Sequence, residues 1–455
     1  MEQVNIYDGY GSNTYSRMSY VFAFLIIFAG FIECIWGVLQ IFGFIPSGHR
    51  RFLVTGSFYN PGPFGCFLAC VLPIVTSSYL SRKHKRFTPV FILFFVMCIF
   101  LLPGGLSRSG WIAAVIGCAF TVYSMNKYKL DILRKSPLLI FLSIVICLIF
   151  LTAIYLYKQD SADGRLFIWK VAVGYLCEIP LLGVGWQNVA GVYGLAQESY
   201  FNMCHGTQRE ILLADAPSYL YNEYLQIAFA YGIPCALLFV ALLITSFILF
   251  YRSRRFGFAG SILSFAICCL TSYPLQFWEF KLLVCLLVIF SGLFITDKIR
   301  RLFTISLYTI LCGLFLATSI NFDVDEPYDQ AHQLASIGQF DKANKIAKSL
   351  LYKNSSNELL MFIGDNYQRM GLRDSAEYYF LRGATRIPNR LYPHYRLMKL
   401  HLEEPADSIK AKIEATTIIG MTPKVPSIAA MQIRQEAVKF LNIPISSQQI
   451  VIPDL

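Results

Sequence analysis

The stretch that decides the fold runs from Lys158 to Tyr221, a long polar segment set between runs of apolar residues. It contains Gly164-Arg165, Trp169 and Pro180-Leu181-Leu182-Gly183-Val184-Gly185-Trp186, and it leads into Tyr221-Asn222-Glu223-Tyr224-Leu225-Gln226. The other polar segments between the apolar runs are short. A loop of this length is usually functional rather than a simple connection, so we expect the chemistry of this protein to reside there.

Apart from this loop, the apolar pattern of the first 320 residues predicts a series of membrane spans. The chain has 455 residues, 56% of them hydrophobic, and its mean hydropathy of +0.52 is far above that of a soluble protein. Nine apolar runs approach the roughly 20 residues that cross a bilayer: 20–45, 64–80, 88–103, 110–124, 137–157, 224–250, 259–277, 281–296 and 302–320. The first twenty residues are polar, and we expect no cleavable signal peptide.

The basic residues indicate the orientation of these spans. Residues 321–455 hold 16 Lys/Arg against 15 Asp/Glu, so nearly all of the net charge of +11 belongs to the apolar part. There the bases cluster in alternate loops: Arg82, Lys83, Lys85, Arg86; Lys127, Lys129, Arg134, Lys135; Arg252, Arg254, Arg255; Lys298, Arg300, Arg301. Basic loops stay in the cytoplasm. The charge is therefore a topology signal and does not indicate nucleic-acid binding.

Nine spans with a cytoplasmic N-terminus place every basic cluster inside. The fold class predicted is all-α: a transmembrane helical bundle in residues 1–320, with a large external loop at 158–222, followed by a soluble helical domain in residues 321–455. In a bacterium with two membranes, this topology predicts an inner-membrane protein whose C-terminal domain lies in the periplasm.

The cysteines give no sign of a metal site. All thirteen precede residue 313, most lie within apolar runs, and none has CxxC or Cys/His ligand spacing. We expect most to pack as small apolar residues. Cys177 and Cys204 share the external loop, where an oxidising compartment would allow them to pair.

The C-terminal segment carries a repeat. Gly338-Gln339-Phe340-Asp341-Lys342-Ala343 is echoed 33 residues later by Gly371-Leu372-Arg373-Asp374-Ser375-Ala376, and Pro388 follows the second unit. This period resembles the tetratricopeptide repeat, with a degenerate third unit at 392–417 and a cap at 418–455. Such repeats bind peptides or proteins, so a protein partner is predicted here. A plain helical domain explains the same residues.

Four external segments carry the candidate chemistry. They are Gly56-Ser57-Phe58-Tyr59-Asn60-Pro61-Gly62-Pro63-Phe64-Gly65, Leu106-Ser107-Arg108-Ser109-Gly110-Trp111, the Gly164-to-Gly185 region, and Asn222 with Gly232 ten residues on. An external arginine such as Arg108 is disfavoured unless it has a partner or a function.

In order, spacing and topology these segments resemble the O-antigen ligase and polymerase superfamily, over about residues 20–300. The resemblance implies a membrane glycosyltransferase that uses a glycan carried on undecaprenyl diphosphate. Its members include O-antigen ligases, O-antigen polymerases and O-linked oligosaccharyltransferases. Ligases usually carry His directly before the Asn of the fourth segment, where this chain has Tyr221, and most members have further N-terminal spans.

Transfer from a lipid diphosphate requires stabilisation of the leaving group, and guanidinium groups bind phosphate oxygens bidentately. We therefore expect Arg108 and Arg165 to bind the diphosphate; snorkelling to headgroups is the alternative. Glu223, Tyr221, Asn222 and, less so, His205 are the candidates for orienting or deprotonating the acceptor hydroxyl. Glu223 could instead cap the helix that follows it.

Trp186, Tyr193 and Tyr219 (with Tyr200 beside them) give the loop an aromatic character suited to stacking on sugars, although interfacial anchoring explains them equally well. We expect no metal and no cofactor. Lipid A-core is the first acceptor considered, then protein Ser/Thr, then a growing glycan. A transporter, for which Glu33 is the clearest intramembrane charge, and a membrane-tethered scaffold remain as rivals of another class.

Overall fold

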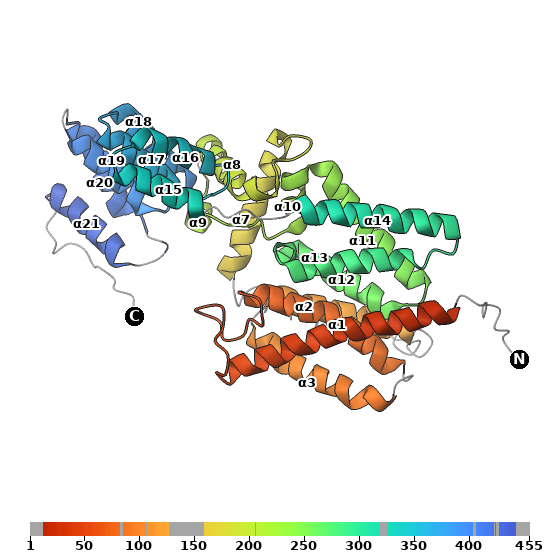
Figure 1. Cartoon of the computed structure of the whole chain (residues 1–455). Helices are drawn as coiled ribbons and strands as arrows, with labels where there is room; N and C mark the ends of the chain where they lie inside the picture. The colour runs from red at the N-terminus through yellow and green to blue at the C-terminus, as the bar shows by residue number, and fades with distance from the viewer. Residues whose placement is uncertain are drawn as a thin grey trace, which may run out of the picture. The chain divides into compact units, whose positions relative to one another are not determined.

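The computed structural model describes residues 12–81, 85–105, 107–126, 159–204, 206–318, 325–403, 406–422, 424 and 427–442. Within these ranges every regular element is a helix (Figure 1), as the all-α prediction states. The chain forms two compact units. The first comprises residues 1–159, 221–228 and 233–320, and the second comprises residues 160–220, 229–232 and 321–455.

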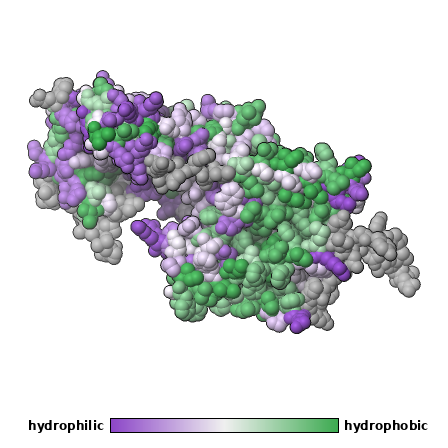
Figure 2. Space-filling model, in the orientation of Figure 1, coloured by the Kyte–Doolittle hydropathy of each residue, from purple (hydrophilic) through white to green (hydrophobic). Residues whose placement is uncertain are grey.

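The first unit is built from apolar helices. They are α1 (Ser12–Ile41), α2 (Pro61–Leu80), α3 (Thr88–Gly104), α4 (Arg108–Met125), α11 (Ile233–Arg252), α12 (Phe256–Thr271), α13 (Trp278–Gly292) and α14 (Lys298–Thr318), with short 3₁₀ turns η1 (Lys85–Phe87) and η4 (Pro274–Gln276). Hydrophobic residues cover much of the face of α1 and of α11–α14 visible in Figure 2.

Four of these helices, α1 from Arg17, α2, α11 and α14, are long and apolar enough to cross a membrane, and α3 and α12 are shorter apolar helices. The predicted span at 137–157 lies outside the described residues. The predicted count of nine spans stays a prediction. One predicted span differs in form, because the run 224–250 is divided at Gly232 into α10 (Glu223–Tyr231) and α11.

Glycines bring α2, α4 and α12 close together in the first unit. A Cβ at Gly110 would lie 2.6 Å from the carbonyl carbon of Gly65, and a Cβ at Gly260 would lie 2.3 Å from Oγ1 of Thr121. Apolar helices associate through such small residues, which let backbones approach. Gly65 and Gly110, which belong to the first and second of the four segments quoted above, therefore also serve helix packing.

The loop before α2 is held by polar side chains of α1. Glu33 accepts hydrogen bonds from the backbone N–H (3.0 Å) and hydroxyl (2.6 Å) of Ser57. Gln40 accepts from the N–H groups of Thr55 and Gly56, both at 2.9 Å. Glu33, the residue that the sequence offers as the charge of a transporter, thus has a structural role in holding this loop.

The second unit combines the external loop with the C-terminal segment. Its loop elements are α7 (Gln159–Tyr175), η2 (Leu176–Glu178), η3 (Trp186–Asn188), α8 (Val189–Cys204) and α9 (Gln208–Leu213). Its C-terminal helices are α15 (Asp325–Ser336), α16 (Phe340–Leu350), α17 (Glu358–Arg369), α18 (Arg373–Arg386), α19 (Leu391–Leu402), α20 (Ser408–Gly420) and α21 (Ile428–Phe440).

Successive C-terminal helices pack in pairs, α15 with α16, α17 with α18 and α19 with α20. Gly338 (φ +80°) and Gly371 (φ +76°) lie in the turns inside the first two pairs, 33 residues apart. Leu359, Leu360, Ile363, Phe380 and Leu397 are buried between the pairs. Helix pairs of this kind are what the 33-residue step predicts, and the assignment to the tetratricopeptide family stays a prediction.

Candidate functional site

The start of α4 is fixed on both sides by serines. Ser107 caps the helix by accepting from the N–H of Gly110, and its hydroxyl donates to the carbonyl of Gly62 at 3.2 Å. Ser109 accepts from the hydroxyl of Thr271 at 2.9 Å. Arg108, half-buried between these two serines, therefore stands on a rigid backbone at the positive end of a helix. Such a position favours binding of an anion.

Residues 221–223 are also held in place by contacts within the first unit. Tyr221 has a φ of 53°, an uncommon conformation for a residue with a side chain, and its ring lies edge-on to Tyr273 with centroids 5.2 Å apart. Asn222 caps α10 by accepting from the N–H of Leu225 at 3.1 Å, and its amide donates to the carbonyl of Leu270 at 3.3 Å.

Because Asn222 provides the cap, the Glu223 carboxyl is available for another role. It is 1% exposed, and its Oε1 accepts from the N–H of Leu275 at 2.6 Å. Its Oε2 is buried without a hydrogen-bond partner among the described residues. Burial raises the pKa of Glu223 to about 8, an effect that the Leu275 N–H and the charge of Lys281 partly offset. A carboxyl tuned to this range suits general acid–base work near neutral pH.

Sequence reasoning missed Lys281. This residue of α13 is 1% exposed, and its Nζ lies 4.7 Å from the centre of the Trp278 ring. It is the charge that acts on Glu223. The available signal was a lysine at the start of the apolar run 281–296, since ionisable residues in such runs are commonly functional.

The end of the third sequence segment, residues 181–185, contacts the end of the fourth, residues 229–232, within the second unit. Val184 donates its N–H to the carbonyl of Phe229, and Gly185 donates to that of Ala230, both at 2.9 Å. At Gly232 (φ +86°) a Cβ would lie 1.8 Å from the carbonyl oxygen of Leu181. The glycines of the two segments are therefore needed for one shared backbone contact.

Arg165 lies half-buried on α7, also in the second unit. On the same helix Trp169 donates its indole N–H to the carbonyl of Leu220 at 2.9 Å, directly before Tyr221 in the sequence. The structure thus links α7 to the end of the loop, while Arg108 belongs to the first unit.

The candidate sugar-stacking residues differ in exposure. Tyr193 is 0% exposed and donates its hydroxyl to Gln197 at 2.9 Å, and Trp186 is 5% exposed and stacks on Tyr231 at 5.9 Å. In this arrangement both rings pack inside the unit and offer no open face to a sugar. Tyr219 is half-buried, and His205 lies outside the described residues. Cys177 is a free, exposed thiol, and the side chain of Cys204, its predicted partner, is not among those described.

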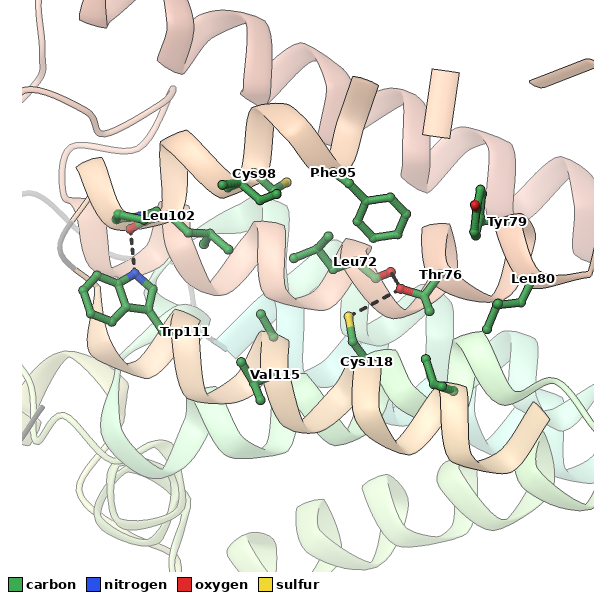
Figure 3. A pocket seen from close by; sticks show the side chains of 14 residues that line it. Leu72, Thr76, Tyr79, Leu80, Phe95, Cys98, Leu102, Trp111, Val115 and Cys118 are labelled. Carbon is green, nitrogen blue, oxygen red and sulfur yellow. Dashed lines mark hydrogen bonds between the residues drawn. The ribbon is translucent and has the colours of Figure 1, made fainter. Parts of the chain in front are cut away.

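An apolar pocket of about 750 Å³ opens between α2, α3 and α4 (Figure 3). Trp111, one turn beyond Arg108, lines it and donates its indole N–H to the carbonyl of Leu102 at 2.6 Å. Leu72, Ile99 and Val115 contribute aliphatic lining. Its chemistry suits a hydrocarbon chain. Among the described residues no cluster of metal-ligating side chains is present.

Part of the chain matches a known protein family. Residues 93–240 match the sequence profile of the O-antigen ligase family, a range that contains Arg108, Arg165 and Tyr221–Glu223. No curated protein and no solved structure matches the chain. The family match supports the O-antigen ligase superfamily, and with it an O-antigen ligase- or polymerase-like membrane glycosyltransferase. The helices from α15 onward lie beyond the matched range.

Proposed function

We propose, from the O-antigen ligase match of residues 93–240, that this chain transfers a glycan from undecaprenyl diphosphate to an acceptor hydroxyl. The family match is the observation that carries the proposal. The position of Arg108 at the start of α4 and the buried carboxyl of Glu223 support it. Lipid A-core is the proposed acceptor. A protein Ser/Thr or a growing glycan would use the same chemistry and are the alternatives.

In the proposed reaction the acceptor oxygen bonds to the anomeric carbon while the bond from that carbon to the diphosphate oxygen breaks. The electron pair leaves on undecaprenyl diphosphate. Arg108 and Arg165 would bind that diphosphate, since a permanently charged guanidinium stabilises the charge that develops on it. The apolar pocket beside Trp111 would hold part of the isoprenoid chain. No metal or nucleotide takes part in the proposed step.

The acceptor proton would pass to Glu223. A carboxylate whose pKa is raised to about 8 is a stronger base than an ordinary glutamate, although a smaller fraction is ionised at pH 7. Asn222 and Tyr221 would orient the acceptor next to it. In this proposal Glu223 takes the place of the histidine that ligases usually carry before the Asn.

The proposed location is the bacterial inner membrane, with the N-terminus in the cytoplasm and the loop and C-terminal helices in the periplasm. The basic clusters such as Arg252, Arg254 and Arg255 support this orientation. The donor glycan would then be used on the periplasmic side.

Complementation of a knockout tests the proposal. Surface glycan is compared by gel for wild type, Arg108→Ala and Arg165→Ala at matched expression, together with the pool of lipid-linked donor. The proposal expects wild type to restore the glycan and both variants to leave the donor accumulating. Migration of the product with lipid or with protein identifies the acceptor. Full restoration by both variants would favour a scaffold or a transporter instead.

A further inference from the structure

The C-terminal helices contact the external loop closely, and at Gly191 of the loop only glycine fits without a shift. On α8, a Cβ at Gly191 would lie 2.1 Å from the carbonyl carbon of Tyr352, and a Cβ at Gly194 would lie 3.1 Å from Cα of Ser355. Both partners lie in the turn between α16 and α17. Because the backbones of α8 and of this turn are in direct contact, α8 has no room to move toward the turn.

A partly buried ion cluster adjoins this contact. Glu198 of α8 accepts from Nε and Nη2 of Arg382, at 2.7 and 3.1 Å, and from Nη2 of Arg386 at 3.0 Å. Arg386 is 0% exposed. The neighbouring Gln197 donates to the carbonyl of Arg386 at 2.6 Å. Because a buried guanidinium requires a counter-charge, α8 and α18 depend on each other.

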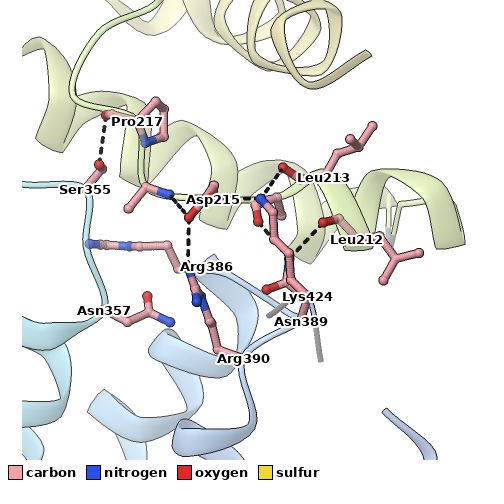
Figure 4. A network of polar contacts seen from close by, with 12 residues as sticks. Leu212, Leu213, Asp215, Pro217, Ser355, Asn357, Arg386, Asn389, Arg390 and Lys424 are labelled. Atoms are coloured by element: carbon pink, nitrogen blue, oxygen red, sulfur yellow. Dashed lines mark hydrogen bonds and ion pairs between the residues drawn. The ribbon is translucent and has the colours of Figure 1, made fainter. Parts of the chain in front are cut away.

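The segment that follows α8 is held in the same way (Figure 4). Asn389 donates its amide to the carbonyls of Ile211 (2.8 Å) and Ala214 (2.7 Å), at the C-terminal end of α9, where the helix leaves carbonyls unsatisfied. Asp215 pairs with Arg390 at 2.9 Å and with Lys424 at 2.7 Å. These bonds fix the chain a few residues before Tyr221.

The helix that carries Arg165 rests on this held segment. On α7, Lys170 pairs with Glu210 of α9 at 2.6 Å, and Phe167 packs on Phe201 of α8 with centroids 5.8 Å apart. Trp169 bonds to the carbonyl of Leu220. Each element that contacts α7 here is itself held by α16–α19.

We propose that the C-terminal helices act on their own chain, as a clamp that holds residues 186–220 and so orients Arg165 for glycan transfer. Glu198, Arg386 and Asn389 are positioning residues in this account, which rests on the proposed function. The clamp explains why a repeat-like segment is joined to a glycosyltransferase-like domain without requiring a peptide ligand.

The test combines a weakened clamp with a reversible lock. Asn389→Ala removes the cap of α9, and Gly191→Ala forces α8 away from Tyr352. Gly174→Ala on α7, where a Cβ meets nothing within 4 Å, is the matched control. The lock is Gly194→Cys with Ser355→Cys, because an ideal Cβ at Gly194 lies 3.4 Å from Cβ of Ser355, close to disulfide spacing. Each single cysteine variant controls for the thiols.

Two quantities are measured on the full-length protein: hydrogen exchange of residues 186–220 and the rate of glycan transfer. We expect both weakening variants to speed exchange and to lower kcat by about 100-fold, the usual effect of misplacing a binding group by about 1 Å. The control should match wild type. In the Asn389→Ala background, oxidation of the cysteine pair should restore the rate and reduction should abolish it again.

Three results would overturn the proposal. Faster exchange with unchanged transfer would mean that the clamp does not position Arg165. A locked wild-type background without activity would mean that α8 must leave the C-terminal helices during turnover. Unchanged exchange in both weakening variants would mean that there is no clamp. If wild type itself transfers no glycan, the proposed function and the positioning role fail together, while exchange still reports separately on the clamp.

Discussion

Replacing Gly232 by alanine tests whether the two glycine-containing segments meet as described. Gly232 has a φ of +86°, and a Cβ there would lie 1.8 Å from the carbonyl oxygen of Leu181. A side chain in the left-handed region costs roughly 1–2 kcal/mol, and overpacking a close contact costs about 1–3 kcal/mol more. The expected loss of local stability is therefore about 2–5 kcal/mol.

The contact can be read from two amides. Val184 and Gly185 donate their N–H groups to Phe229 and Ala230, so hydrogen exchange of the peptide that contains them reports on this contact. Since 1.4 kcal/mol is a tenfold change in an equilibrium constant, a loss of about 2 kcal/mol should speed their exchange by at least about 30-fold.

Gly338→Ala is the matched control. It has a φ of +80°, but a Cβ there meets nothing within 4 Å, so the variant carries the backbone strain without the clash. It should lower the thermal midpoint in detergent by less than Gly232→Ala and leave the exchange of Val184 and Gly185 unchanged. If the two variants had equal midpoints and equal exchange at these amides, Leu181 would not lie against Gly232 and the described geometry would be incorrect.

Substitutions at three further positions have expected outcomes. Because burial raises the pKa of Glu223 to about 8, the rate of transfer by wild type should increase as pH rises through 8 and the carboxylate forms. Glu223→Gln should be slow and should show no such increase with pH. A wild-type rate that is constant from pH 6 to 9 would exclude Glu223 as the base. Glu33→Ala leaves the N–H and hydroxyl of Ser57 without their acceptor and should destabilise the protein by about 1–3 kcal/mol, seen as a lower midpoint in detergent; an unchanged midpoint would contradict it. Asn60→Ala removes the cap of α2 and should cost about 1 kcal/mol, whereas Asn60→Ser should restore most of it.

The helical class could be predicted because it depends on local composition. Apolar runs and turn residues lie next to one another in the sequence, and eight of the nine predicted runs overlap described helices of the first unit or α10, while the run at 137–157 is not described. The break at Gly232 could not be placed in this way. Its conformation is set by Leu181, which belongs to a different sequence segment.

The polar contacts of the candidate site could not be predicted from the sequence either, because the partners belong to different sequence segments. The sequence drew attention to Glu223, but its partner is the backbone N–H of Leu275, which any residue except proline would supply. Arg386 and Glu198 lie on helices that no periodic pattern associates. Tyr193 was selected for being aromatic, whereas burial, which depends on the whole unit, determines what its ring can contact.

The measurement that tests the central claim most directly is a transfer assay with purified protein in liposomes containing undecaprenyl diphosphate-linked glycan and lipid A-core. The account predicts that wild type releases one undecaprenyl diphosphate for each glycan joined to the acceptor, and that Arg108→Ala and Arg165→Ala release almost none. Movement of intact donor across the bilayer without release of diphosphate would contradict it.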